Sequence, residues 1–307
     1  MTLGRLKEIL AGDVGRRFVI GVPYAWLIAF FVVPFLIVFK ISFSEVRFSI
    51  PPYAPLFELT EDEAHWRAIF NLGNYHYLIT DSLYIATFAY SIKVAAVSTL
   101  LCLAIGYPMA YAIARAREST RNLLLMLIVL PFWTSFLLRV YAWVGLLQND
   151  GVINNVLLAV GLIDQPLTLL YTDFAVYVGI VYSYLPFMIL PLYSNLEKHD
   201  LTLLEAAADL GARPMTAFLR ITLPLSIPGI VAGCLLVFIP AVGEYVIPSL
   251  LGRSDQLMIG RVLSDEFFAN RDWPVASAVA IVLLVALLVP ILVFQRYQNR
   301  EIEAARR

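Results

Sequence analysis

Apolar residues fill six stretches of this chain, and each stretch is long enough to cross a membrane. A bilayer core about 30 Å thick needs about 20 residues of helix. The predicted spans are residues 18–41, 88–114, 122–147, 173–194, 225–248 and 275–295. Pro186 and Pro191 fall inside the fourth span, where neighbouring helices can satisfy the freed carbonyls. The pattern predicts an all-α integral membrane protein with a single transmembrane domain over residues 1–307.

Composition supports a membrane protein and argues against several other classes. The chain is 60% hydrophobic and 15% charged, whereas soluble domains carry about 25% charged residues. A formal net charge of -1 argues against nucleic-acid binding. The three histidines are scattered without the spacing of metal ligands, and the chain has no GxxxxGK[ST], HExxH or GxSxG motif. We expect no enzyme activity, no cofactor and no metal site.

Lysine and arginine set the expected orientation. With both termini in the cytoplasm, 14 of them fall in cytoplasmic segments and 6 in outer segments. This bias is the one that the positive-inside rule requires. Residues 42–87 then form an outer loop, and the apolar middle of the next outer loop, 148–172, is too short to span and favours a short interfacial helix.

The predicted cytoplasmic loop, residues 195–224, has the pattern of two short helices. Leu203, Leu204, Ala207 and Leu210 recur at helical spacing. Asp200 or Thr202 can cap the first helix, and Glu205 follows Thr202 as in a capping box. Gly211 is suited to a left-handed terminal position, and Pro214 to the first turn of the next helix.

The spacing in this loop is specific. Glu205-Ala206-Ala207 is followed after three residues by Gly211, and after nine more by Ile221, one residue and Leu223-Pro224. This arrangement resembles the EAA loop of permease subunits in binding-protein-dependent ABC importers. The segments FWTSFLLRVYAW, FIPAVGEYVIPSLLG and EFFANRDWPVASAVAI are similar to the permease subunits of putrescine/spermidine (polyamine) importers, and this resemblance runs from about Tyr24 to Val293.

The resemblance implies a type I ABC importer permease fold in a bacterial inner membrane. It implies three kinds of partner besides the lipid bilayer: a second homologous permease subunit, two copies of a cytoplasmic ATPase that hydrolyses the ATP, and a periplasmic polyamine-binding protein. The short helix of the loop is expected to dock on the ATPase. The coupling residues implied are Glu205, Ala206, Ala207, Gly211, Ile221, Leu223 and Pro224.

A polyamine site needs carboxylates for ammonium groups and aromatic faces for methylenes. Glu244 is the acidic residue placed well inside a predicted span, where a charge usually faces a cavity. Pro240, Gly243 and Pro248 around it favour an irregular helix. The candidate pathway residues are Glu244, Tyr245, Asp173, Tyr184, Tyr141 and Trp133.

Alternatives remain open at this point. Glu244 either contacts the transported cation or pairs with Arg139, which lies within the third predicted span. The alternative substrate is another small solute, because the receptor usually sets specificity in the resembled family. An ion-driven secondary transporter would be expected to show inverted repeats and paired intramembrane carboxylates, and the sequence has neither.

The orientation gives a direct labelling test. Cysteines introduced at Lys198 and Asp255 should react oppositely with a membrane-impermeant thiol reagent, because the charge bias puts residue 198 inside and residue 255 outside. Labelling of residue 198 from outside intact cells would overturn the topology.

Overall fold

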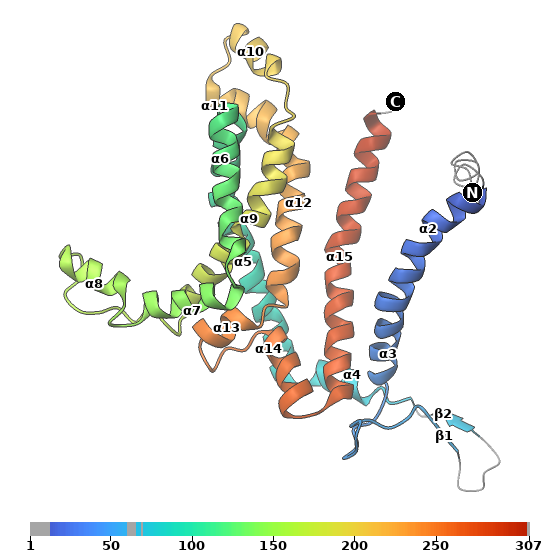
Figure 1. Ribbon diagram of the computed structural model, residues 1–307. Coiled ribbons are helices and arrows are strands. Elements are labelled where there is room, and N and C mark those ends of the chain that lie inside the picture. The colour runs from blue at the N-terminus through green and yellow to red at the C-terminus, as the bar shows by residue number, and fades with distance from the viewer. Residues whose placement is uncertain (1–12, 60–65, 69, 306–307) are drawn as a thin grey trace, which may run out of the picture. The chain divides into compact units, whose positions relative to one another are not determined.

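The computed structural model describes residues 13–59, 66–68 and 70–305 (Figure 1). It divides into two compact units, which we describe separately. The first unit comprises residues 1–80 and 266–282, and the second comprises residues 81–265 and 283–307.

The first unit opens with one continuous helix. It runs through α2 (Asp13–Leu27), a π-helical turn (Ile28–Val32) and α3 (Val33–Ile41). Residues Arg17–Ile41 form a helix that is long and apolar enough to cross a membrane, over nearly the same range as the first predicted span, 18–41. No residue is buried in its most apolar stretch of 18 residues, so those side chains are available to lipid or to another chain.

The outer loop contains more structure than its polar sequence suggests. A two-stranded antiparallel hairpin joins β1 (Phe57–Leu59) to β2 (Trp66–Ala68), and α4 (Gly73–Thr80) follows. These short strands are a local departure from the expected all-α structure. The Asn74 side chain ties α4 to the end of α3, since its Nδ2 donates to the carbonyls of Ser42 and Ser44, each at 2.9 Å.

Three long helices form the core of the second unit. They are α5 (Ser82–Arg115), α9 (Asp173–Leu196) and α12 (Leu223–Val242), which pack against one another. All three are apolar enough to span, and α9 passes through both of its prolines without a break. Helix α12 continues α11 (Pro214–Ala217) through a π-helical turn (Phe218–Thr222), so that the whole helix covers Pro214–Val242.

Glycines allow α12 and α9 to approach closely. The GxxxG pair Gly229 and Gly233 predicts such packing. A Cβ built on Gly229 would lie 2.7 Å from the Cβ of Asn195, and one on Gly233 would lie 2.7 Å from the Sδ of Met188. Neither position has room for a methyl group, which confirms the prediction. Met188 belongs to the buried cluster at the centre of this unit.

The third predicted span, 122–147, is wrong as a single helix. Helix α6 (Glu118–Val129) and a 3₁₀ turn (Leu130–Trp133) end at Thr134, whose backbone is extended. Helices α7 (Phe136–Leu147) and α8 (Val152–Ala159) follow. The two halves, Glu118–Trp133 and Phe136–Ala159, are bent by 91°, and α7 and α8 lead away from the bundle of α5, α9 and α12 (Figure 1). Helix α8 is the short helix expected in loop 148–172.

The fifth predicted span, 225–248, is wrong at its outer end. Helix α12 stops at Val242, and the chain continues as α13 (Val246–Leu251) and α14 (Ile259–Ser264). A π-helical turn (Asp265–Ala269) then leads to α15 (Trp273–Ala305), which contains the sixth predicted span. In the described part of the chain, five helices are long and apolar enough to span a membrane, or six with the bent pair counted as one.

Candidate functional site

The loop that is predicted to couple to the ATPase begins at the end of α9. Five residues separate Leu196 from the start of α10 (Thr202–Asp209). The Thr202 backbone N–H donates to the Asp200 carboxylate at 3.0 Å, and this bond lowers the pKa of Asp200. The capping box expected between Thr202 and Glu205 is absent, since Leu201 occupies the N-cap position without a side-chain bond.

Helix α10 ends at Gly211 with a left-handed turn. Gly211 has φ +80, its N–H donates to the Ala208 carbonyl at 2.8 Å, and the Ala212 N–H donates to the Ala207 carbonyl at 2.9 Å. This pair of bonds is the Schellman motif, which favours glycine at that position. Pro214 begins α11, as the sequence predicts.

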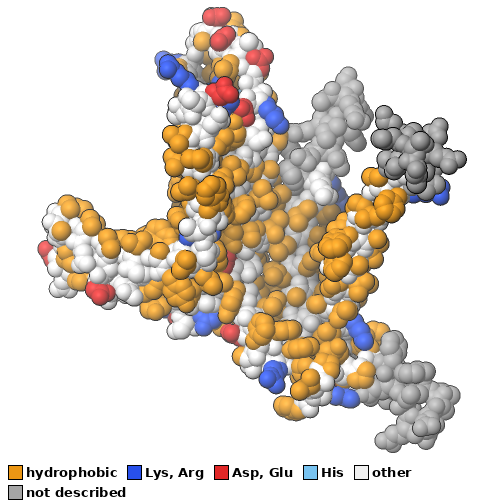
Figure 2. Space-filling model, in the orientation of Figure 1, with side chains coloured by type: hydrophobic (Ala, Val, Ile, Leu, Met, Phe, Trp, Pro, Cys, Tyr) orange, Lys and Arg blue, Asp and Glu red, His pale blue; other side chains and the backbone are white. Residues whose placement is uncertain are grey.

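The loop presents an exposed surface at one end of the second unit. Helix α10 has no buried residue, Glu205 and Ala206 are exposed, and Leu210 is 90% exposed. Figure 2 shows charged side chains gathered around α10 and hydrophobic side chains along the helices below it. Exposed leucines beside a charged rim are typical of a protein-docking surface. Of the other pattern residues, Ile221 and Leu223 are half-buried where α11 runs into α12.

Glu244 lies in the break between α12 and α13, and it is only 7% exposed. Its Oε1 accepts the backbone N–H groups of Tyr245, Val246 and Ile247 at 3.1, 3.0 and 3.3 Å. The Tyr184 hydroxyl donates to its Oε2. The carboxylate therefore supplies an acceptor to the free N–H groups of the first turn of α13, and it joins that helix to α9.

The possible ion pair between Glu244 and Arg139 is absent from the described structure. The Arg139 guanidinium lies over the rings of Phe132 and Phe136, at 5.3 and 5.7 Å from their centroids, and its Nε is buried without a partner. Cation–π contacts of this kind compensate part of the cost of a buried cation. No cation accompanies Glu244 within the described residues.

The structure gathers some of the pathway candidates and separates others. Tyr184 and Tyr245 lie at Glu244. Asp173 is the first residue of α9, where it accepts the Tyr90 hydroxyl at 3.0 Å. Trp133 and Tyr141 are exposed, on the 3₁₀ turn and on α7 respectively.

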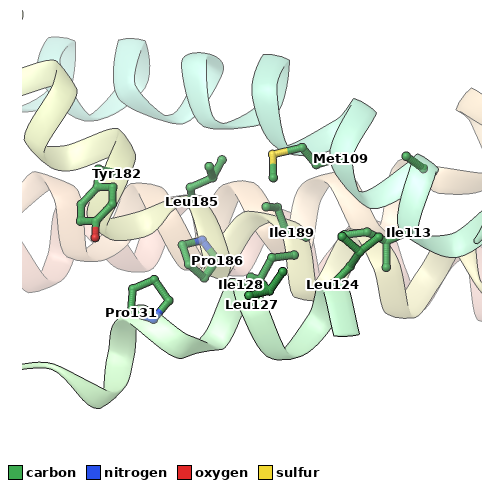
Figure 3. Close-up of a pocket in the computed structure, with 11 residues that line it drawn as sticks. Met109, Ile113, Leu124, Leu127, Ile128, Pro131, Tyr182, Leu185, Pro186 and Ile189 are labelled. Carbon is green, nitrogen blue, oxygen red and sulfur yellow. The ribbon is translucent and has the colours of Figure 1, made fainter. Parts of the chain in front are cut away.

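A cavity of about 450 Å³ separates α6 from α5 and α9 (Figure 3). Leu124, Leu127 and Ile128 of α6 face Met109 and Ile113 of α5 and Leu185 and Ile189 of α9 across it. Its lining residues include no carboxylate, so it offers an organic cation no charge partner.

Two contacts were not found by sequence reasoning. Arg121 of α6 forms an ion pair with Glu197 at 2.8 Å. The Ile259 backbone N–H donates to the Ser91 hydroxyl at 2.8 Å, which fixes the start of α14 on α5. The positions of Arg121 and Glu197, both at cytoplasmic ends of predicted spans, were a usable signal for the first contact, but nothing in the sequence indicates the second.

A family model for binding-protein-dependent transport system inner membrane components matches residues 103–303. The chain belongs to this family and is a permease subunit of a binding-protein-dependent importer, a multi-pass protein of the inner membrane.

Among individual proteins, it is 41% identical to the spermidine/putrescine transport system permease protein PotB of Salmonella typhimurium strain SL1344, over 92% of this chain and 93% of the relative. It is 40% identical to PotB of Escherichia coli strain K12, over 91% and 97%. The fold matches a chain of a bacterial ABC transporter that imports the acidic polysaccharide alginate, with TM-score 0.69, 17% identity, and coverage of 96% and 99%.

Proposed function

We propose that this chain is the transmembrane permease subunit of an ATP-driven polyamine importer. Putrescine is the first substrate we propose and spermidine the second, each delivered by a periplasmic binding protein. The observation that carries the proposal is the 40–41% identity to proteins named as spermidine/putrescine permeases over more than nine tenths of this chain. The second candidate is an importer of another small solute, since the receptor sets specificity in the resembled family.

The working complex we propose contains a second homologous permease and two copies of a cytoplasmic ATPase. The exposed surface of α10 supports this assembly, because small Ala206 and Ala207 allow close docking and Glu205 offers a charge to a partner. Both termini are cytoplasmic in this proposal, in agreement with the charge bias of the loops.

The solute pathway we propose passes Glu244. No cation accompanies its carboxylate in the described residues, and its partners are backbone dipoles and a hydroxyl. The negative charge is therefore stabilised without being neutralised, and it still favours an organic cation. The Tyr184 hydroxyl can rotate to release Oε2 to an ammonium group, while Tyr184 and Tyr245 present ring faces to methylenes. Asp173, Tyr141 and Trp133 are further candidates along the route.

Receptor-stimulated ATP hydrolysis tests the substrate. In vesicles that contain the two permeases and the ATPase, the receptor loaded with putrescine or spermidine should raise hydrolysis well above the rate with unloaded receptor. Stimulation only by a receptor loaded with a solute that is not an amine would contradict the polyamine assignment and favour the second candidate.

Gly211→Val tests the coupling loop. A β-branched residue at φ +80 is strained by about 1–2 kcal/mol, so the turn after α10 should change shape. We expect receptor-stimulated ATP hydrolysis to fall at least several-fold, or the ATPase to detach during purification. Gly161→Val is the matched control, because Gly161 has φ +73 and open space but lies beyond α8. Normal coupling in the Gly211 variant would contradict the docking assignment.

Glu244→Gln separates a substrate role from a purely structural one. The amide keeps one oxygen for the N–H groups of α13, so the complex should still assemble, whereas Glu244→Ala leaves them unpaired at about 1–3 kcal/mol each. If Glu244 attracts the cation, polyamine uptake by the Gln variant should fall about tenfold or more while the melting temperature stays near that of the unmodified complex. Unchanged uptake in a well-assembled Gln variant would refute the substrate role.

A further inference from the structure

Helix α6 has no direct chain connection to the coupling loop. The loop leaves α9 at Leu196 and returns through α11 into α12, so a displacement of α10 reaches those two helices along the backbone. The His199 ring adds a cross-link, with Nε2 3.2 Å from the Leu225 carbonyl. Any response of α6, and of the bent segment that follows it, requires a side-chain contact.

The ion pair between Arg121 and Glu197 provides such a contact. Arg121 lies in the first half of α6, and Glu197 is the residue that directly follows α9. Their Nη1 and Oε1 atoms are 2.8 Å apart, and the two side chains are 25% and 38% exposed. The Tyr193 hydroxyl also hydrogen-bonds Glu197, which restricts where the carboxylate can point.

A cavity lies beside this pair. The cavity of about 450 Å³ lies between the middle of α6 and the helices α5 and α9 (Figure 3). Side chains that line a void lose the contacts that would otherwise transmit a displacement. At the far end of α6, the Phe132 ring meets the Phe187 ring of α9 edge to face, at 5.3 Å between centroids. Between these two contacts, Leu124, Leu125 and Ile128 of α6 pack against the buried cluster beside the cavity. Helix α6 thus meets α9 near its two ends and is incompletely packed along its middle.

We propose that Arg121 and Glu197 form a mechanical tie through which α6 follows the coupling loop. Both are positioning residues, and the inference rests on the proposed coupling function of residues 195–224. When α10 moves with the ATPase, Glu197 moves with it and pulls the cytoplasmic end of α6. Helix α6 passes that displacement to the 3₁₀ turn and, across the bend, to α7.

Because the Arg121–Glu197 pair is partly exposed, we expect it to transmit movement between α9 and α6 rather than to stabilise the fold. Partly exposed ion pairs contribute little to the free energy of unfolding, so loss of this one should leave the complex assembled. Contacts on a coupling route change the coupling free energy by about 0.5–2 kcal/mol, which corresponds to about a 2- to 30-fold change in a coupled activity.

A charge swap in the full complex tests the tie. Arg121→Glu and Glu197→Arg should each lower receptor-stimulated uptake within that range, while assembly and the basal rate of ATP hydrolysis persist. The double variant Arg121→Glu/Glu197→Arg restores opposite charges at the two positions, and uptake should recover substantially. Arg117→Glu is the control, since it makes the same charge change at the start of α6 with no ion pair recorded for it in the described structure.

Two results would overturn the tie. The first is unchanged uptake in both single variants, and the second is reduced uptake in both that the double charge-swap variant does not restore. If a charge reversal prevents assembly, Arg121→Gln, Glu197→Gln and their double variant replace it. The tie is supported if uptake falls no further in the double Gln variant than in either single Gln variant. It is overturned if the two single losses of uptake add in the double variant. Gly211→Val, run in parallel, separates the two proposals. Uncoupling by that variant alone refutes the tie, whereas normal coupling in it refutes the coupling function on which the tie rests.

Discussion

Backbone amides inside a lipid bilayer find no water, so a helix that stops within the membrane must satisfy its free N–H and C=O groups inside the protein. The outer half of the second unit depends on this requirement at Glu244. One carboxylate oxygen accepts three N–H groups of the chain that enters α13, and the other accepts the Tyr184 hydroxyl. A close backbone approach completes the arrangement, since a Cβ on Gly260 would lie 2.3 Å from the Gly243 carbonyl oxygen.

The break between α6 and α7 meets the same requirement differently. Pro131 has no N–H to satisfy, and its carbonyl accepts both the backbone N–H and the hydroxyl of Thr134, at 3.2 and 2.8 Å. Arg139, one turn into α7, meets aromatic faces instead of a carboxylate. The buried carboxylate of Glu244 and the partly buried guanidinium of Arg139 are therefore compensated locally and independently, which leaves Glu244 without a cationic partner in the described residues.

The sequence predicted what depends on local pattern. Apolar length located five membrane-spanning helices to within a few residues at most ends, and turn chemistry located Gly211 and Pro214. The 91° bend escaped because Thr134 and Ser135 interrupt the apolar run from Leu123 to Leu138 only briefly. Hydropathy averaged over a span measures transfer to lipid, not the direction of the chain. From its charge alone, Glu244 was expected to pair with a cation, either the transported solute or Arg139. In the structure its carboxylate instead accepts backbone N–H groups at the start of α13, the helix that directly follows it. Such a cap can be recognised only once the end of α12 is known.

Packing density, rather than sequence distance, decides how a displacement at α10 spreads. Helices α9 and α12 meet at Gly229 and Gly233 with no space for a methyl group, so these two helices are closely packed. Helix α6 borders a cavity along part of its length, and Leu124, Leu125 and Ile128 pack against the buried cluster beside it. The same bundle thus combines a closely packed pair, joined to residues 195–224 by the chain, with a third helix that is packed less completely. Unequal packing of this kind gives more weight to the contacts at the two ends of α6, which are the Arg121–Glu197 ion pair and the edge-to-face contact of Phe132 with Phe187.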